Sequence, residues 1–172
     1  KMMIRPLIRL FFLCLLSLSL SAAQAKKSEY EAKALFLEAL LRLTKFSDQT
    51  DTYKVLVLGK NPFRGHLKKL NKKIINGRRV KVYFRKSLSK SSRKYHLVYI
   101  TKSQLSHQED ILAMTDPMTL TVADNKWFIK SGGLVNVVLQ KQGVRWEVNH
   151  DKLSSKHFKI SSKLLRMSLN KK

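Results

Sequence analysis

Apolar residues recur at steps of three and four early in this chain, a period that predicts a helix. They run from Ala32 to Phe46, so we expect the helix to cover about residues 29–45. The pattern S-x-x-E at Ser28 and Glu31 is typical of a capping box, in which the two side chains satisfy backbone N–H groups of the first turn. The folded part of the chain is therefore predicted to open with an amphipathic helix.

Two further leucines widen the apolar stripe of this helix. Leu37 and Leu41 leave little of its middle polar. A helix of that kind either lies buried on two sides or contacts a partner protein. Both interpretations stay open from the sequence, and Leu37 and Leu41 are candidate partner-binding residues.

The middle of the chain alternates between β-branched runs and helical spacing. Asn61-Pro62 predicts a helix start, because proline costs no hydrogen bond at the first helical position, and Asn76-Gly77 predicts a turn. In the strand that follows this turn, the alternation places Phe84 on the inward face and basic residues on the outward face. The predicted strands are 52–58, 80–85, 96–100 and 118–122, and the predicted helices are 61–72 and 104–114.

The last third begins with a glycine pair. Gly132 is expected to end a short helix or turn over 124–131, and Gly133 to let the chain enter a strand. Two alternating runs separated by Lys141-Gln142-Gly143 predict a hairpin, and SSKLLRMSL predicts a terminal helix. The element order predicts an α/β fold: a single compact domain with a central mixed β-sheet flanked by helices and a C-terminal β-hairpin.

The first 25 residues have the composition of a secretory signal peptide. Basic residues precede an uncharged run from Leu10 to Leu20, which is too short to span a bilayer, and the segment ends in Ala23-Gln24-Ala25. We expect cleavage after Ala25, with Ala23 and Ala25 as the small residues that the peptidase needs, which leaves an exported domain over 26–172. An uncleaved membrane anchor is the alternative.

Export would remove Cys14, the only cysteine, so the domain is expected to hold no disulfide and no thiolate. The whole chain has 35 basic and 11 acidic residues; without the three basic residues of the leader, the net charge is about +21. Such a charge indicates an anionic partner or surface, or else only a solvated exterior. Export argues against nucleic acid, which leaves membrane headgroups, cell-wall polymer or an acidic protein domain.

No motif for catalysis is present. A phosphate-binding loop needs glycines that follow a strand and open a helix, but Gly132-Gly133 opens a strand. At Gly59-Lys60 a single glycine follows a strand, as in many ordinary strand-to-helix turns, and no nucleotide-binding glycine motif occurs. The five histidines are scattered, with His150-Asp151 the nearest to a ligand pair, and no G-x-S-x-G is found. We expect no enzyme activity, no cofactor and no metal.

Seven segments after the leader form a recognisable series. Among them are Lys33-Ala34-Leu35-Phe36-Leu37 in the first helix, the L-G-x-x-P-F turn at 58–63, the glycine pair, Asn149 after the hairpin and SSKLL at 161–165. In this order they resemble the YfiR/HmsC-like family of exported regulators. The seven segments are spread over nearly the whole chain after the leader, from residue 31 to residue 167.

This resemblance implies a compact, often dimeric α/β domain without known catalysis. It further implies a periplasmic repressor that binds the periplasmic sensor domain of a membrane diguanylate cyclase and so limits cyclic di-GMP synthesis and biofilm formation. The chain departs from the family in Phe46-Ser47, where Trp-Pro is common, in its lack of cysteines after the leader, and in its charge. The alternative function is a basic structural envelope protein that binds anionic lipid or cell-wall polymer.

Besides Leu37 and Leu41, the candidate partner-binding residues form one basic cluster. It consists of Lys72, Lys73, Arg78 and Arg79, which flank the predicted turn at Asn76-Gly77.

Overall fold

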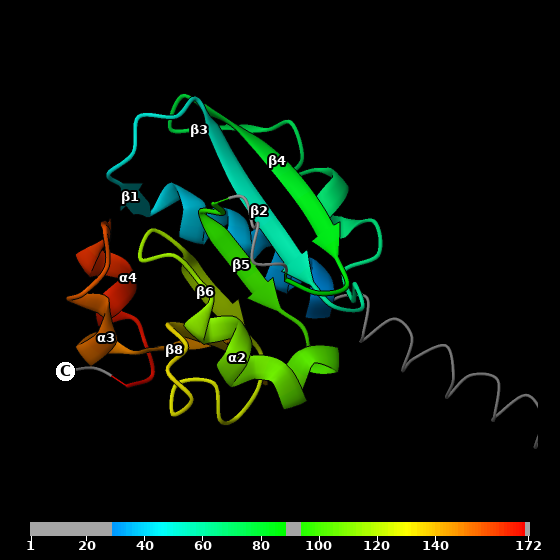
Figure 1. Cartoon of the computed structure of the whole chain (residues 1–172), viewed down its shortest axis with the longest axis vertical. Coiled ribbons are helices and arrows are strands. Elements are labelled where there is room, and N and C mark those ends of the chain that lie inside the picture. The colour runs from blue at the N-terminus through cyan, green and yellow to red at the C-terminus, as the bar shows by residue number, and fades with distance from the viewer. Residues whose placement is uncertain (1–28, 89–93, 171–172) are drawn as a thin grey trace, which may run out of the picture.

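The computed structural model describes residues 29–88 and 94–170, and its centre is a seven-stranded mixed sheet (Figure 1). The strands lie in the order β3-β4-β2-β5-β6-β7-β8, and a separate two-stranded sheet pairs β1 with β9. The predicted fold class is confirmed.

The elements have the following bounds. The strands are β1 (Thr44–Phe46), β2 (Thr52–Leu58), β3 (Ile74–Ile75), β4 (Arg78–Arg85), β5 (Leu97–Ile100), β6 (Leu120–Ala123), β7 (Val135–Gln140), β8 (Gly143–Val148) and β9 (Phe158–Ile160). The helices are the N-terminal helix, described over residues 29–42, together with α2 (Gln108–Ala113), α3 (His150–Leu153), α4 (Ser162–Arg166) and the 3-10 turns η1 (His66–Lys68) and η2 (Lys102–His107).

Five of the seven strands are parallel. They are β4, β2, β5, β6 and β7, and the antiparallel strands β3 and β8 close the two edges. The chain leaves β2 toward β4 on one side and leaves β5 toward β6 on the other, as in doubly wound folds of the flavodoxin-like order.

Strand alternation gives the sheet two apolar faces. On β2, Val55 and Val57 face the core that the N-terminal helix covers, whereas Leu56 and Leu58 face the smaller core that α2 covers. Figure 1 shows this arrangement, with the N-terminal helix (blue) behind the sheet and α2 (green) in front. Burial on both faces explains why β2, β5 and β6 are nearly continuous apolar runs.

The N-terminal helix contributes its wide apolar stripe to the larger core. Leu37 and Leu41 are each 0% exposed. Their burial corrects the expectation that these two leucines lie on a partner-binding surface, because the sheet already covers them. The exposed apolar residue of this helix is Leu35, at 63%.

Three predicted helices and one predicted strand are wrong in extent. The N-terminal helix stops at 42, since residues 44–46 pair with β9 instead of making another helical turn. Only η1 forms within 61–72, because Arg64 and Lys72 adopt left-handed φ values of 51° and 72° that a helix cannot contain. The helix predicted over 104–114 divides into η2 and α2, and the strand predicted over 118–122 begins at residue 120.

The turn at Asn76-Gly77 and the strand after it are confirmed, but the inward position of Phe84 is not. Val80 is fully buried and Val82 packs against the larger core, whereas Phe84 is 45% exposed. Phe84 shares a strand face with the two valines but lies beyond the edge of the core, so alternation alone misplaced it.

The glycine pair has the structural role that the sequence predicts. Gly132 has a φ of 91° and ends the turns that follow β6. Gly133 lies against the ring of the buried Phe128, where a Cβ atom would collide with the ring. The predicted hairpin of β7 and β8 follows, but its turn is only Lys141-Gln142, because Gly143 already pairs with Gln140 as the first residue of β8.

The predicted leader, with Ala23 and Ala25, and the capping residue Ser28 lie outside the described residues. Within the part of the chain that is described, no helix is long and apolar enough to cross a bilayer.

Candidate partner-binding site

The basic cluster predicted from the sequence lies on the hairpin of β3 and β4, at one edge of the sheet. Lys72 and Lys73 precede β3, while Arg78 and Arg79 begin β4. Lys72, Lys73 and Arg79 are exposed and Arg78 is half-buried. Neighbouring strand residues point to opposite faces, so Arg78 and Arg79 serve different surfaces.

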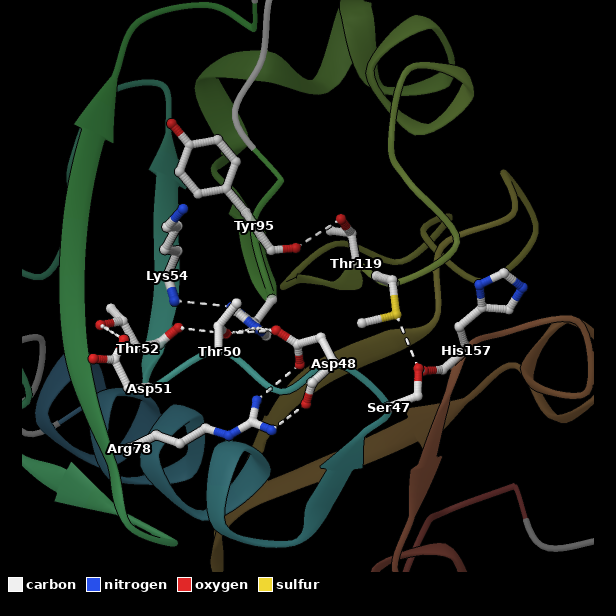
Figure 2. Close-up of polar contacts among 12 residues, drawn as sticks. Ser47, Asp48, Thr50, Asp51, Thr52, Lys54, Arg78, Tyr95, Thr119 and His157 are labelled. Carbon is white, nitrogen blue, oxygen red and sulfur yellow. Dashed lines mark hydrogen bonds and ion pairs between the residues drawn. The ribbon is translucent and has the colours of Figure 1, made fainter.

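Arg78 points inward and holds the loop before β2. Its Nη1 donates to Oδ1 of Asp48 at 2.8 Å, its Nη2 donates to the Asp48 carbonyl, and its guanidinium lies over the Tyr53 ring. Figure 2 shows Asp48 between Arg78 and the side chain of Thr50, which also donates to it. Partial burial would raise the pKa of Asp48, but the hydrogen bonds from Thr50, Arg78 and His96 hold it well below its usual range.

His96 completes this network from the start of β5. Its Nδ1 accepts a hydrogen bond from the Lys54 N–H at 3.0 Å, which leaves Nε2 to donate to Oδ2 of Asp48 at 2.9 Å. Burial lowers the pKa of His96 below its ordinary value, against the opposing effect of Asp48. The arrangement therefore holds a neutral imidazole beside a carboxylate.

An open hollow of about 600 Å³ lies on the Arg78 side of the hairpin, where the N-terminal helix ends. Its walls come from the helix end, β1, the loop before β2, the hairpin and β9. Four cationic side chains line the hollow, against the single carboxylate of Asp48: Arg42, Lys45, Arg78 and Lys159.

Two of these cations face each other directly. Lys45 on β1 and Lys159 on β9 are opposite residues in the antiparallel pair, both are exposed, and neither has an ion pair among the described residues. Like charges in directly opposite positions destabilise a strand pair. An anion placed in the hollow would relieve that repulsion.

Lys73 fixes the hairpin to the N-terminal helix. Its ammonium lies 2.6 Å from Oε1 of Glu38, which Arg42 also contacts at 3.0 Å. The hydrogen bond from Lys73, followed by the smaller effect of Arg42, lowers the pKa of Glu38. Lys73 is thus partly neutralised, while Lys72 and Arg79 keep their charge for solvent or a partner.

The opposite face of the hairpin is exposed too. Ile74 pairs in register with Arg79 and is 62% exposed, and Lys81 lies on the same face of β4. Neither α2 nor the N-terminal helix contributes a residue to a core there. This part of the sheet adds a second basic surface around one aliphatic side chain.

A second buried charge cluster lies at the carboxyl edge of the sheet. Lys33 of the N-terminal helix is 2% exposed and donates to Asp124 at 2.6 Å and to Glu29. Burial acts to lower the pKa of Lys33, but the hydrogen bonds to Asp124 and Glu29 outweigh it and raise the pKa above its ordinary value. Lys102 lies 3.6 Å from the same carboxylate.

Residues 29–88 and 94–170 contain no grouping of three or more histidine, cysteine or acidic side chains suited to a metal ion. His150 instead contacts the carbonyl of Asn170.

Sequence reasoning missed Asp48, His96, Lys45 and Lys159. Asp48 stood in a polar loop and His96 at the start of an apolar strand, so neither had a pattern of its own. A signal for the lysine pair would have required the pairing of β1 with β9, which local periodicity does not encode.

Comparison with known proteins gives one family. The family model described as YfiR/HmsC-like matches residues 30–168, which include every strand and helix described above except the first residue of the N-terminal helix. No curated protein matches the chain.

Proposed function

The chain belongs to the YfiR/HmsC-like family, and on this premise we propose that it is a periplasmic regulatory protein that represses an inner-membrane diguanylate cyclase. In this proposal it binds the periplasmic sensor domain of the cyclase and thereby limits cyclic di-GMP synthesis and biofilm formation. Its role is binding and not catalysis.

The observation that supports this function best is the lysine pair at the hollow. Lys45 and Lys159 repel each other in the free protein, in a wall that already carries Arg42 and Arg78. An acidic segment of a partner domain would relieve this repulsion and gain contact with four cations. Complementary charge of this kind speeds association and selects partners.

The mechanism is a population shift in the receptor. A protein that binds only the inactive state of the sensor domain stabilises that state by its difference in affinity between the two states. A shift from mostly active to mostly inactive requires a preference of roughly 10⁴. Release of the protein would return the cyclase to its active population.

Deletion of the gene tests the proposal in cells. We expect cyclic di-GMP and surface attachment to rise, and the intact gene to restore both. Lys159→Glu should fail to restore them at equal protein level, whereas Lys141→Glu, at the exposed hairpin tip, should restore them. Unchanged cyclic di-GMP in the deletion strain would refute the repressor role.

Crosslinking in intact cells tests direct contact. A photoreactive residue in place of Gln49, which is exposed and lines the hollow, should capture the cyclase, and the same residue in place of Lys141 should not. A product of twice the chain's own mass would instead report the homodimer that the family resemblance implies. Capture of the cyclase from both positions equally would remove the hollow from the proposal.

An alternative function is attachment to anionic lipid or cell-wall polymer. Trp127 is 52% exposed, and the ammonium groups of Lys126 and Lys130 lie 5.2 and 4.8 Å from its ring centroid. Tryptophan and lysine are typical of membrane interfaces. This function predicts that the protein is retained on anionic vesicles and that added salt or Trp127→Ala reduces this retention. The retention should persist when the cyclase is absent.

A further inference from the structure

We infer that the chain binds a small organic anion, through a phosphate or carboxylate group, in a second hollow at the carboxyl ends of β2 and β5. This hollow lies at the opposite end of the parallel strands from the hollow of Lys45 and Lys159. The inference stands whether or not the chain regulates a cyclase.

The topology places a crevice at this point. The chain turns toward β4 after β2 and toward β6 after β5, so the two connections diverge from adjacent parallel strands. Ligands of open α/β sheets bind where the connections diverge in this way, outside the carboxyl ends of the strands. The hollow has a volume of about 420 Å³, within the range of small-molecule sites.

The two connections that form the hollow are locked to each other. The Lys60 N–H donates to Oγ of Ser103 at 2.8 Å, and the Thr101 hydroxyl donates to the Leu58 carbonyl at 2.9 Å. Gly59, with a φ of 101°, lies so close to Thr101 and Ser103 that any Cβ atom would collide with both hydroxyls. The site is therefore formed before any ligand arrives.

The charge in the walls favours an anion. Lys60 and Arg64 line the hollow without an ion pair among the described residues. Lys102 lies 3.6 Å from Asp124, and Asp124 shares Lys33 with Glu29. Lys33 and Lys102 thus balance Asp124 and Glu29, while Lys60 and Arg64 remain uncompensated. Both arginine and lysine bind phosphate and carboxylate groups.

Hydroxyl and apolar groups complete the site. Because Thr101 uses its hydrogen on Leu58, the Ser103 hydroxyl at 2.9 Å from it can turn its own hydrogen from Thr101 to a ligand oxygen. Tyr30 and Pro62 line the same hollow and offer an apolar surface to the organic part of a ligand. This combination distinguishes the hollow from a merely basic surface.

Titration of the isotope-labelled protein with AMP, citrate and inorganic phosphate, followed by amide chemical shifts, tests the inference. We expect saturable shifts at residues 60–64 and 101–103, with AMP or citrate tighter than phosphate. AMP as the tighter ligand would identify a phosphate site and citrate a carboxylate site. Failure of all three to saturate, or shifts centred on Lys45 and Lys159, would overturn the inference.

Arg64→Gly separates binding from folding. Arg64 has a φ of 51°, which glycine adopts more readily, so the variant should melt at the same or a higher temperature. It should nevertheless lose about tenfold in affinity, as expected for one charge-assisted hydrogen bond. Lys69→Gln removes an exposed charge from the same connection outside the hollow and should change affinity less than about twofold. Equal losses in the two variants would show only nonspecific attraction and overturn the site.

Discussion

Lys45 and Lys159 occupy directly opposite positions in the antiparallel pair of β1 and β9, with no acidic partner among the described residues. The free protein therefore holds a repulsion at the hollow that we propose as its partner-binding site. A surface selected only for stability would not keep two like charges in register.

Lys159→Glu should stabilise the free protein. The substitution converts a repulsive cross-strand pair into an attractive one, which is worth about 0.5 to 1 kcal/mol in the free energy of unfolding. Urea denaturation at low salt measures this gain, and added salt should reduce it. Lys141→Glu, with the same change in net charge at the hairpin tip, serves as the control for charge alone. If Lys159→Glu were no more stable than this control, the two lysines would not repel each other.

Lys33→Met should destabilise the fold strongly. Lys33 is 2% exposed and neutralises Asp124, whose side chain is 6% exposed. Removal of one partner from a buried ion pair leaves an uncompensated charge and costs about 3 to 5 kcal/mol. Lys33→Met combined with Asp124→Leu should recover part of that loss, since the more buried of the two carboxylates that Lys33 binds is then also removed. A double variant as unstable as the single one would show that the pair is not the cause.

Stability should fall in acid in two stages. The pKa of His96 is lowered from 6.5 in the folded protein, so the unfolded chain takes up its proton first and stability is lost as pH falls below about 6.5. The pKa of Asp48 is lowered from 3.8, so its contribution is present above that value and is lost as pH falls further. Protonation of His96 would also place an N–H at Nδ1, where the Lys54 N–H already donates, so two donors would face each other. The positive charges of Arg78 and Lys54 further disfavour the protonated imidazole.

Thermal unfolding between pH 7 and pH 3 measures both stages. His96→Gln cannot titrate and should lose the dependence that begins below about pH 6.5, while it keeps the dependence that begins below about pH 3.8. His107→Gln, at an exposed histidine, should keep both stages. A first stage that survives in His96→Gln would assign it to another group.

Six of the seven strands of the sheet could be predicted because each of them carries its own signal. In β2 and β5 the signal is a continuous β-branched and apolar run, and in β4 it is the alternation that follows the turn at Asn76-Gly77. The two-residue strand β3 was not predicted. β1 could not be predicted, since TKF continues the helical pattern before it and becomes a strand only by pairing with β9. The helix predicted after Pro62 does not form for a similar reason. Arg64 has a left-handed backbone conformation, which the sequence does not reveal because arginine usually favours a helix.

The same distinction applies to the site. The basic hairpin was predictable from four residues close in sequence, but its division into an inward Arg78 and an outward Arg79 required the strand register. The hollow needs segments from 42 to 161 to converge, and no local pattern encodes that convergence.

Gly133→Ala should cost more stability than its small change in volume suggests. Gly133 is buried against the ring of Phe128, which is itself 0% exposed, and a Cβ atom would collide with three carbons of that ring. Because the ring has no free space to move into, we expect a loss of about 1 to 3 kcal/mol in the free energy of unfolding, as for other overpacked cores.

Gly65→Ala is the matched control, since Gly65 has an ordinary φ of −88° and a Cβ atom added there would meet nothing within 4 Å. It should be neutral or slightly stabilising through the unfolded chain. Gly133→Ala combined with Phe128→Leu should lose less than the sum of the two single variants; additive losses would place the cost of Gly133→Ala in the backbone and not in the contact with Phe128.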